Sequence, residues 1–241
     1  SIAARLQAEI QSISVAARNA ADAQSMIDTA DGALGETSNI LLRMRELAVQ
    51  ASTGTLTSDD RASLDAEFQQ LEAEIDRIDA NTTFAGVSLF DNTSKTFQVG
   101  IDGSGGSNQI TNTIGSMAAH DLGIDSAGAD NDASTAGDNL ANADLTTQAN
   151  AQATITRLDD AIKLVSTERG KLGALSNRLS STITNLDQVR VNLSASQGRI
   201  EDADFAEETA NLAKGQILQQ AATAMLAQAN ASKQTVLALV R

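Results

Sequence analysis

The sequence predicts a mainly α-helical protein, in which long helices pair antiparallel as a coiled-coil-like rod with a small β-hairpin region at one end. Three observations lead to this fold class. The 241-residue chain has no Pro, where average usage would give about 12, and Pro breaks helix interiors. Apolar residues recur at intervals of three and four near both ends of the chain, which places them on one helix face. The stretch between these two patterns is short, so it predicts a small β insertion and no large additional domain.

The first predicted helix spans residues 1–53 and the second spans residues 58–80. Thr53-Gly54-Thr55 separates the two patterns. Either Thr57 or Ser58 is expected to cap the second helix, because acidic residues follow in its first turn. The apolar positions that carry the helical spacing are Ile2, Leu6, Ile10, Ile13, Ile27, Leu34, Leu41, Met44 and Ala48 in the first helix, and Leu64, Phe68, Leu71, Ile75 and Ile78 in the second.

Residues 81–115 change character, with short runs that contain Thr, Phe and Val between polar and Gly-rich turns. Polar and apolar residues alternate over 96–99 and again over 109–111, which predicts one or two β-hairpins. Residues 116–149 are rich in Ala, Asp, Asn, Gly and Thr. They are expected to form a solvated excursion.

A third predicted helix spans residues 150–197 and has the strongest pattern, a coiled-coil-like seam of about five heptads. Residues 199–241 form another amphipathic pattern, so the chain divides into a rod domain, 1–198, and a C-terminal helix, 199–241. Periodicity alone equally allows a soluble helical bundle with no assembly role. The seam consists of Ile155, Leu158, Ile162, Val165, Leu172, Leu179, Ile183, Leu186 and Leu193, interrupted only by Arg169, Ser176 and Arg190.

The composition excludes several classes of function. The formal net charge is 17 − 31 = −14, which disfavours binding to nucleic acid or to anionic membranes. The absence of Trp and Tyr argues against stacking platforms for bases or sugars. No run of about 18 apolar residues is present, so no membrane span is expected.

Catalytic and metal chemistry is also disfavoured, and we expect neither an enzyme nor a cofactor. His120 is the only His and there is no Cys, so a Ser-His triad and the usual zinc ligand sets are incomplete. Asp130-Asn131-Asp132 is similar to the start of a calcium loop, but Thr135 and Ala141 stand where such a loop requires Gly and Glu. These residues are interpreted as a solvated loop.

Many short motifs, in the right order, resemble one family. The run from Leu41 to Gln50, LLRMRELAVQ, is similar to the end of the first long helix of bacterial flagellins, and the runs around 75–78 and 83–87 resemble their turn into a β-region. The C-terminal half resembles the same family from Leu172 through the run at 199–205 to Arg241. The chain begins where the outer part of the family's rod begins, so we expect the partner strand of its innermost helix pair to be absent.

The resemblance implies a secreted, extracellular structural subunit that assembles with copies of itself into the bacterial flagellar filament. It also implies an export chaperone and, in animal hosts, a Toll-like receptor that recognises flagellin. Two alternatives remain open: the hook–filament junction protein, which shares the end helices, and a surface adhesin or polysaccharide-binding protein.

The resemblance also suggests site residues. The resemblance implies receptor contacts on Arg43, Leu47 and Glu67, although Leu42 stands where many receptor-activating flagellins carry Gln. Arg43 and Leu47 are four residues apart, which places them on one helix face. Leu237, Leu239 and Val240 form a motif for an intracellular sensor. An apolar stripe is expected to mediate polymerisation, and it consists of Phe205, Leu212, Ile217, Leu218, Met225 and Leu226.

Overall fold

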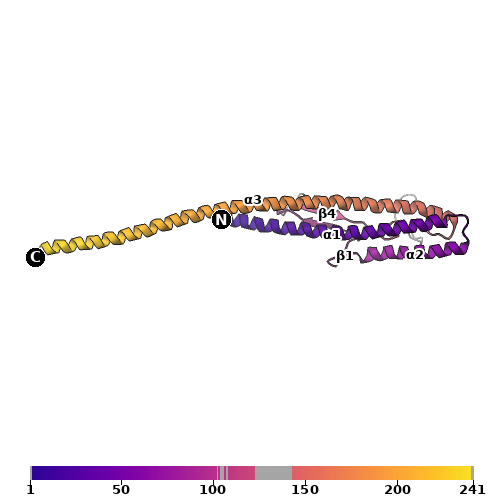
Figure 1. Ribbon diagram of the computed structural model, residues 1–241, viewed down its shortest axis with the longest axis horizontal. Helices are drawn as coiled ribbons and strands as arrows, with labels where there is room; N and C mark the ends of the chain where they lie inside the picture. The colour runs from indigo at the N-terminus through magenta and orange to yellow at the C-terminus, as the bar shows by residue number, and fades with distance from the viewer. Residues whose placement is uncertain (1, 102, 104–105, 107, 123–142, 240–241) are drawn as a thin grey trace. The chain divides into compact units, whose positions relative to one another are not determined.

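The computed structural model describes residues 2–101, 103, 106, 108–122 and 143–239, except for the side chains of 204 and 230–239. The chain is mainly helical, with two small antiparallel sheets of two strands each (Figure 1). This confirms the predicted fold class. In chain order the elements are α1 (Ile2–Ala51), α2 (Ser58–Asn81), β1 (Thr83–Phe84), β2 (Val87–Ser88), β3 (Ser94–Gln98), β4 (Gln109–Thr113) and α3 (Gln148–Leu239).

The chain forms two compact units. The larger unit, residues 13–187, contains α2, the sheets, most of α1 and the first part of α3. The smaller unit combines residues 1–12 with 188–241. Within the smaller unit, Gln197 Nε2 donates a hydrogen bond to Gln7 Oε1 at 2.9 Å.

In the larger unit, α1 and α3 run antiparallel and side by side (Figure 1), and their buried residues form what we call the α1–α3 seam. The buried positions of α1 keep a three-and-four spacing over its whole length in this unit, as predicted. Many of these residues are small, which lets helices approach closely. The positions with this spacing are Ile13, Ala16, Ala20, Ala23, Ile27, Ala30, Leu34, Thr37, Leu41, Met44, Ala48 and Ala51, and Met26 and Leu47 are buried beside them.

The α3 side of the seam differs in part from the prediction. Leu158, Val165, Leu172 and Leu179 are buried, as the heptad spacing requires. Between them the buried residues include Ala161 and Glu168, whereas Ile155, Ile162 and Ile183 are only partly buried. Glu168 accepts a hydrogen bond from Lys171 Nζ at 2.8 Å, which supplies a partner for its buried carboxylate.

Two ion pairs of opposite direction fix the register of the seam. Arg45 of α1 binds Asp159 of α3, with Nε 2.6 Å from Oδ1, and Arg169 of α3 binds Asp31 of α1, with Nε 2.8 Å from Oδ1. In each pair a second guanidinium nitrogen reaches the other carboxylate oxygen. Sliding α3 by one heptad would break both pairs and bring no opposite charge into their place. Arg169, which interrupts the apolar pattern, is therefore a register contact.

Helix α2 begins as the sequence predicts. The Thr57 side chain accepts a hydrogen bond from Asp60 N, and the Asp60 carboxylate accepts one from Thr57 N, which completes a capping box. The Thr57 hydroxyl also donates to the Asp60 carboxylate at 2.7 Å, and this bond, followed by the one from Thr57 N, lowers the pKa of Asp60. Phe68 and Ile75 lie on the inner face of α2 and are buried in the common core, which α2 shares with α1 and α3.

Carboxylates of α2 hold the two segments that flank 123–142. Asp79 Oδ1 accepts a hydrogen bond from Met117 N at 2.6 Å, Asp76 Oδ1 accepts one from Ala119 N at 2.8 Å, and Asp65 Oδ1 accepts one from Leu145 N at 2.8 Å. Burial raises the pKa of Asp79, with smaller contributions from Asp121 and Asp76. Carboxylates thus accept the hydrogen bonds from these backbone N–H groups that a neighbouring strand or helix turn would otherwise accept.

These contacts correct the prediction of a solvated excursion over 116–149, because its two described ends are packed into the core. Met117, Ala119 and Leu122 are buried at one end, and Ala143 and Leu145 are buried at the other. Single apolar residues among Ala, Asp and Thr carry no periodicity. Nothing local in the sequence therefore signals their burial.

The hairpins confirm the β-region. Phe97 of β3 pairs with Ile110 of β4, in register with Ser94 opposite Thr113. β1 and β2 are joined by a two-residue turn in which Ala85 has φ 51° and Gly86 has φ 81°. Such a turn requires positive φ at both positions, which Gly adopts freely and Ala only with strain.

One further prediction differs from the structure. The sequence suggested separate helices over 150–197 and 199–241, whereas α3 continues through 198 and 199 without a break. No Pro interrupts it, and Gly198 costs only about 1 kcal/mol relative to Ala, too little to end a long helix.

Leu179→Asp is expected to unfold the larger unit, because Leu179 is fully buried in the seam. An unpaired carboxylate there costs several kcal/mol, comparable with the roughly 5–15 kcal/mol that stabilises a domain. Thermal unfolding followed by circular dichroism measures this. Leu164→Asp is the matched control, because Leu164 lies on the same helix but is half-exposed. Equal melting temperatures for the two variants would show that the seam is wrongly assigned.

Candidate assembly and recognition surfaces

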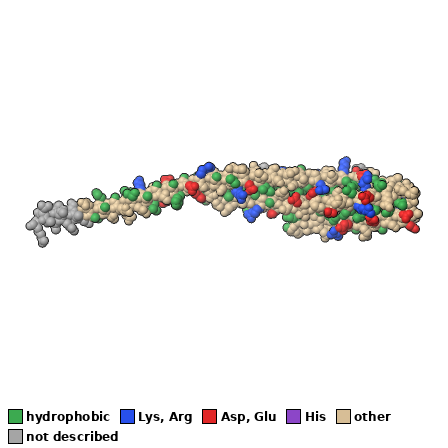
Figure 2. Space-filling model, in the orientation of Figure 1, with side chains coloured by type: hydrophobic (Ala, Val, Ile, Leu, Met, Phe, Trp, Pro, Cys, Tyr) green, Lys and Arg blue, Asp and Glu red, His purple; other side chains and the backbone are tan. Residues whose placement is uncertain are grey.

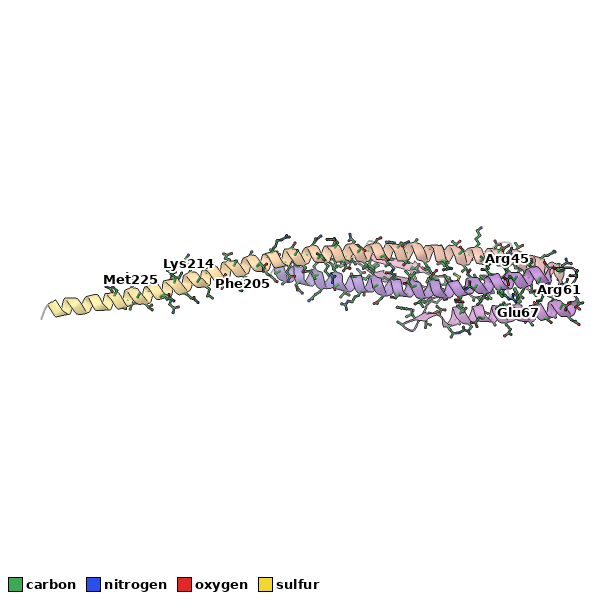
Figure 3. The ribbon with its side chains drawn as sticks, viewed as in Figure 1. Arg45, Arg61, Glu67, Phe205, Lys214 and Met225 are labelled. Atoms are coloured by element: carbon green, nitrogen blue, oxygen red, sulfur yellow. The ribbon has the colours of Figure 1, made fainter. Side chains whose placement is uncertain are left out.

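The turn between α1 and α2 is held by one side chain. The Arg61 guanidinium donates to three backbone carbonyls, those of Ala51 at 2.9 Å, Leu56 at 3.0 Å and Thr53 at 2.7 Å (Figure 3). These oxygens include the C-terminal end of α1, where the helix dipole favours a cation. Nothing in the spacing of the sequence indicates this contact, since it depends on the path of the turn.

Beside this turn, Arg43 and Glu67 meet on the surface shared by α1 and α2. Arg43 Nη2 and Nε lie 2.8 Å and 3.0 Å from Glu67 Oε1, and Nη1 lies 2.9 Å from Glu46 Oε2. These hydrogen bonds, first of all that to Glu67, raise the pKa of Arg43. All three side chains are about half-exposed or more. The structure therefore brings two of the expected receptor residues into direct contact on an accessible surface.

The third expected receptor residue lies elsewhere. Leu47 is only 1% exposed and belongs to the common core. Although Arg43 and Leu47 are four residues apart, they lie on opposite sides of the edge of the buried face, and the Leu47 side chain points inward. The accessible apolar side chains of this part of α1 are Leu42 and Val49, both about half-exposed. Leu47 can influence this surface only through packing beneath it.

The second candidate surface is the part of α3 from 199 to 229, which we call the terminal segment. Figure 2 shows hydrophobic side chains standing out along it. Six of its large apolar residues are between 58% and 72% exposed, and its other described side chains are also exposed except for Ile200, which is half-buried. These six are the expected polymerisation residues, namely Phe205, Leu212, Ile217, Leu218, Met225 and Leu226.

The six side chains do not form a single stripe, which corrects the sequence-based description. At about 100° per residue, Phe205, Leu212 and Leu226 fall within about 60° of one another around the helix axis. Leu218 and Met225 form a second row roughly 120° away, and Ile217 faces a third direction. A helix that is apolar on several sides is buried on several sides in its working state. One partner helix is therefore too little to cover this segment.

Other expected features give no second site. Val240 and Asp130-Asn131-Asp132 lie outside the described residues, as do the side chains of Leu237 and Leu239. In the part of the chain that the structure describes, no group of three acidic or His side chains is placed to hold a metal ion. Over those same residues, no helix combines the length and apolar character needed to cross a membrane.

Comparison with known proteins matches both ends of the chain to one family. The model of the bacterial flagellin N-terminal helical region matches residues 1–95, and that of the bacterial flagellin C-terminal helical region matches residues 155–240. A flagellin of Halalkalibacterium halodurans is 42% identical over 240 residues, which cover 100% of this chain and 83% of the relative.

Solved structures agree. The crystal structure of Bacillus cereus flagellin aligns with a TM-score of 0.57 at 34% identity, over 70% of this chain and 88% of that one. A Vibrio parahaemolyticus protein described as flagellar hook-associated aligns with a TM-score of 0.64 at 16% identity, over 82% of this chain and 95% of that one. The second likeness shows the fold alone.

Arg61→Lys is expected to destabilise the protein by about 1–3 kcal/mol, because a compact ammonium cannot reach three carbonyls spread over the turn. Denaturant unfolding measures the loss. Arg77→Lys is the control on the same helix, since Arg77 is exposed and pairs only with Glu74 in the same α2 turn, and it should change stability by less than about 0.5 kcal/mol. If Arg61→Lys unfolds at the parent's midpoint, Arg61 does not hold the turn.

Proposed function

The chain belongs to the bacterial flagellin family and is a structural subunit of the flagellar filament, and from this premise we propose that the terminal segment is the surface buried between subunits when the filament forms. The observation that carries the proposal is the exposure of six large apolar side chains along 199–229. Monomeric soluble proteins rarely leave so many large apolar side chains exposed along one segment.

Burial of this surface supplies a sufficient driving force. A large apolar side chain gains roughly 1.5–3 kcal/mol when fully buried, so six of them amount to something on the order of 10 kcal/mol per subunit. Since these residues point in three directions, several neighbours share the contact. Such contacts between different faces propagate from copy to copy, as filament growth requires.

The same surface fits an export chaperone. Before secretion, a subunit with these side chains uncovered would associate with other apolar surfaces. A partner that covers 199–229 therefore keeps the subunit monomeric. Secretion to the cell exterior then precedes assembly. The chaperone and the filament neighbours compete for one surface in this scheme.

Assembly is tested with the Leu212→Asp variant of the protein at its natural length. No filaments are expected by negative-stain microscopy, while the melting temperature stays near that of the parent, because Leu212 is exposed in the monomer. Leu212→Met, which keeps an apolar helix-forming side chain, is the control and should assemble. Filaments of normal length from Leu212→Asp would contradict the proposed contact.

We further propose that the exposed Arg43–Glu67 pair forms part of the surface that a flagellin-sensing Toll-like receptor binds. Support comes from the direct contact of the two side chains and their exposure beside Leu42. A planar guanidinium held by a carboxylate presents its remaining donors in a fixed direction. Leu47 is assigned a supporting role beneath the pair.

Arg43→Ala combined with Glu67→Ala should lower receptor signalling in reporter cells at least tenfold if the parent signals, with stability changed by less than about 1 kcal/mol. The control, Arg77→Ala with Glu74→Ala, removes another exposed pair on α2 and should leave signalling unchanged. Equal losses from both double variants would remove the Arg43–Glu67 pair from the receptor surface.

Leu47→Ala should instead cost about 2–5 kcal/mol of stability, because it leaves a cavity.

A further inference from the structure

The four methionines of the chain lie in two very different environments. Met26, Met44 and Met117 belong to the core and are at most 5% exposed. Met225, on the terminal segment, is 72% exposed (Figure 3). Because oxidation requires access to the sulfur, the four thioethers should differ greatly in their rates.

Met225 also lacks the usual competitors for an oxidant. The chain contains no Cys, Trp or Tyr, the side chains that otherwise react with peroxides and hypohalous acids alongside Met. The other large apolar residues of the terminal segment are Phe, Leu and Ile, which carry no oxidisable heteroatom. The most reactive accessible group of the described residues is therefore the Met225 sulfur.

The position of Met225 gives its oxidation a consequence. It lies one heptad after Leu218, in the second apolar row of the terminal segment, and next to Leu226 in the first row. We propose that Met225 is a modification site at which peroxides or hypohalous acids oxidise the free subunit and thereby prevent its addition to the filament. The effect on assembly rests on the proposed burial of 199–229, whereas the selectivity of oxidation does not.

The chemical step is a two-electron oxygen transfer. A lone pair of the Met225 sulfur attacks one oxygen of hydrogen peroxide and the O–O bond breaks. The departing hydroxide takes up the remaining proton and leaves as water, while the thioether becomes a sulfoxide. Sulfur loses two electrons and each of the two peroxide oxygens gains one, so no further reactant is needed.

The product does not fit a buried contact. A sulfoxide replaces a flexible apolar group by a polar one with a strong acceptor oxygen, and the neighbouring residues of the row are apolar side chains that donate no hydrogen bond. Burying an unsatisfied acceptor weakens a contact on the order of tenfold or more. In a filament the same mismatch recurs in each oxidised copy.

Selectivity is tested by treating the protein with hydrogen peroxide and mapping tryptic peptides by mass spectrometry over time. Met225 is expected to oxidise at least tenfold faster than Met26, Met44 or Met117. A second measurement in denaturant should make the four rates similar, which shows that folding causes the difference. Similar rates in the folded protein would overturn the proposal.

Assembly is tested by the critical concentration for seeded growth, with and without peroxide. The critical concentration after peroxide treatment, divided by that without it, should be about ten in the parent and in Met117→Leu. The same ratio should be about one in Met225→Leu. A ratio of one in the parent, or of ten in Met225→Leu, would overturn the role of Met225. Leu212→Asp separates this outcome from failure of the assembly contact, because normal growth of that variant would contradict the proposed function while leaving the selectivity of oxidation intact.

Discussion

The α1–α3 seam is the interaction on which the larger unit of this flagellin depends. Layers of Leu158, Val165, Leu172 and Leu179 repeat every seven residues and meet an α1 face that combines large and small side chains. Helix α2, the hairpins and the segments beside 123–142 share the core that this pair creates. Since apolar layers alone permit slippage by a heptad, the two opposed ion pairs supply the register that they lack.

Periodicity predicted the seam, the helices and the hairpins, because each depends on local residue spacing. It could not predict Glu168 in the core, since a charged residue enters only when a partner such as Lys171 compensates its burial. The contacts of Arg61 and of Asp65, Asp76 and Asp79 were also missed. Each joins a side chain to distant backbone, and such pairs leave no pattern in a single sequence.

The candidate surfaces were predicted with similar limits. Family motifs identified Arg43 and Glu67, and the structure places them in contact. Helical spacing wrongly suggested that Leu47 shares their accessible face, because a separation of four residues does not distinguish the edge of a core from its outside. The terminal segment was recognised as apolar, but its description as one stripe overlooked the angular spread of Leu218, Met225 and Ile217.

The chain buries the apolar surface of 13–187 internally, and in our proposal other copies of the chain bury that of 199–229. Amide hydrogen exchange across residues 199–229, compared between free subunits and filaments, tests this division most directly. The account predicts rapid exchange in the free subunit, much faster than in the buried turns of α1, and slowing by at least about a hundredfold in the filament. Equal protection of this segment in both states would contradict it.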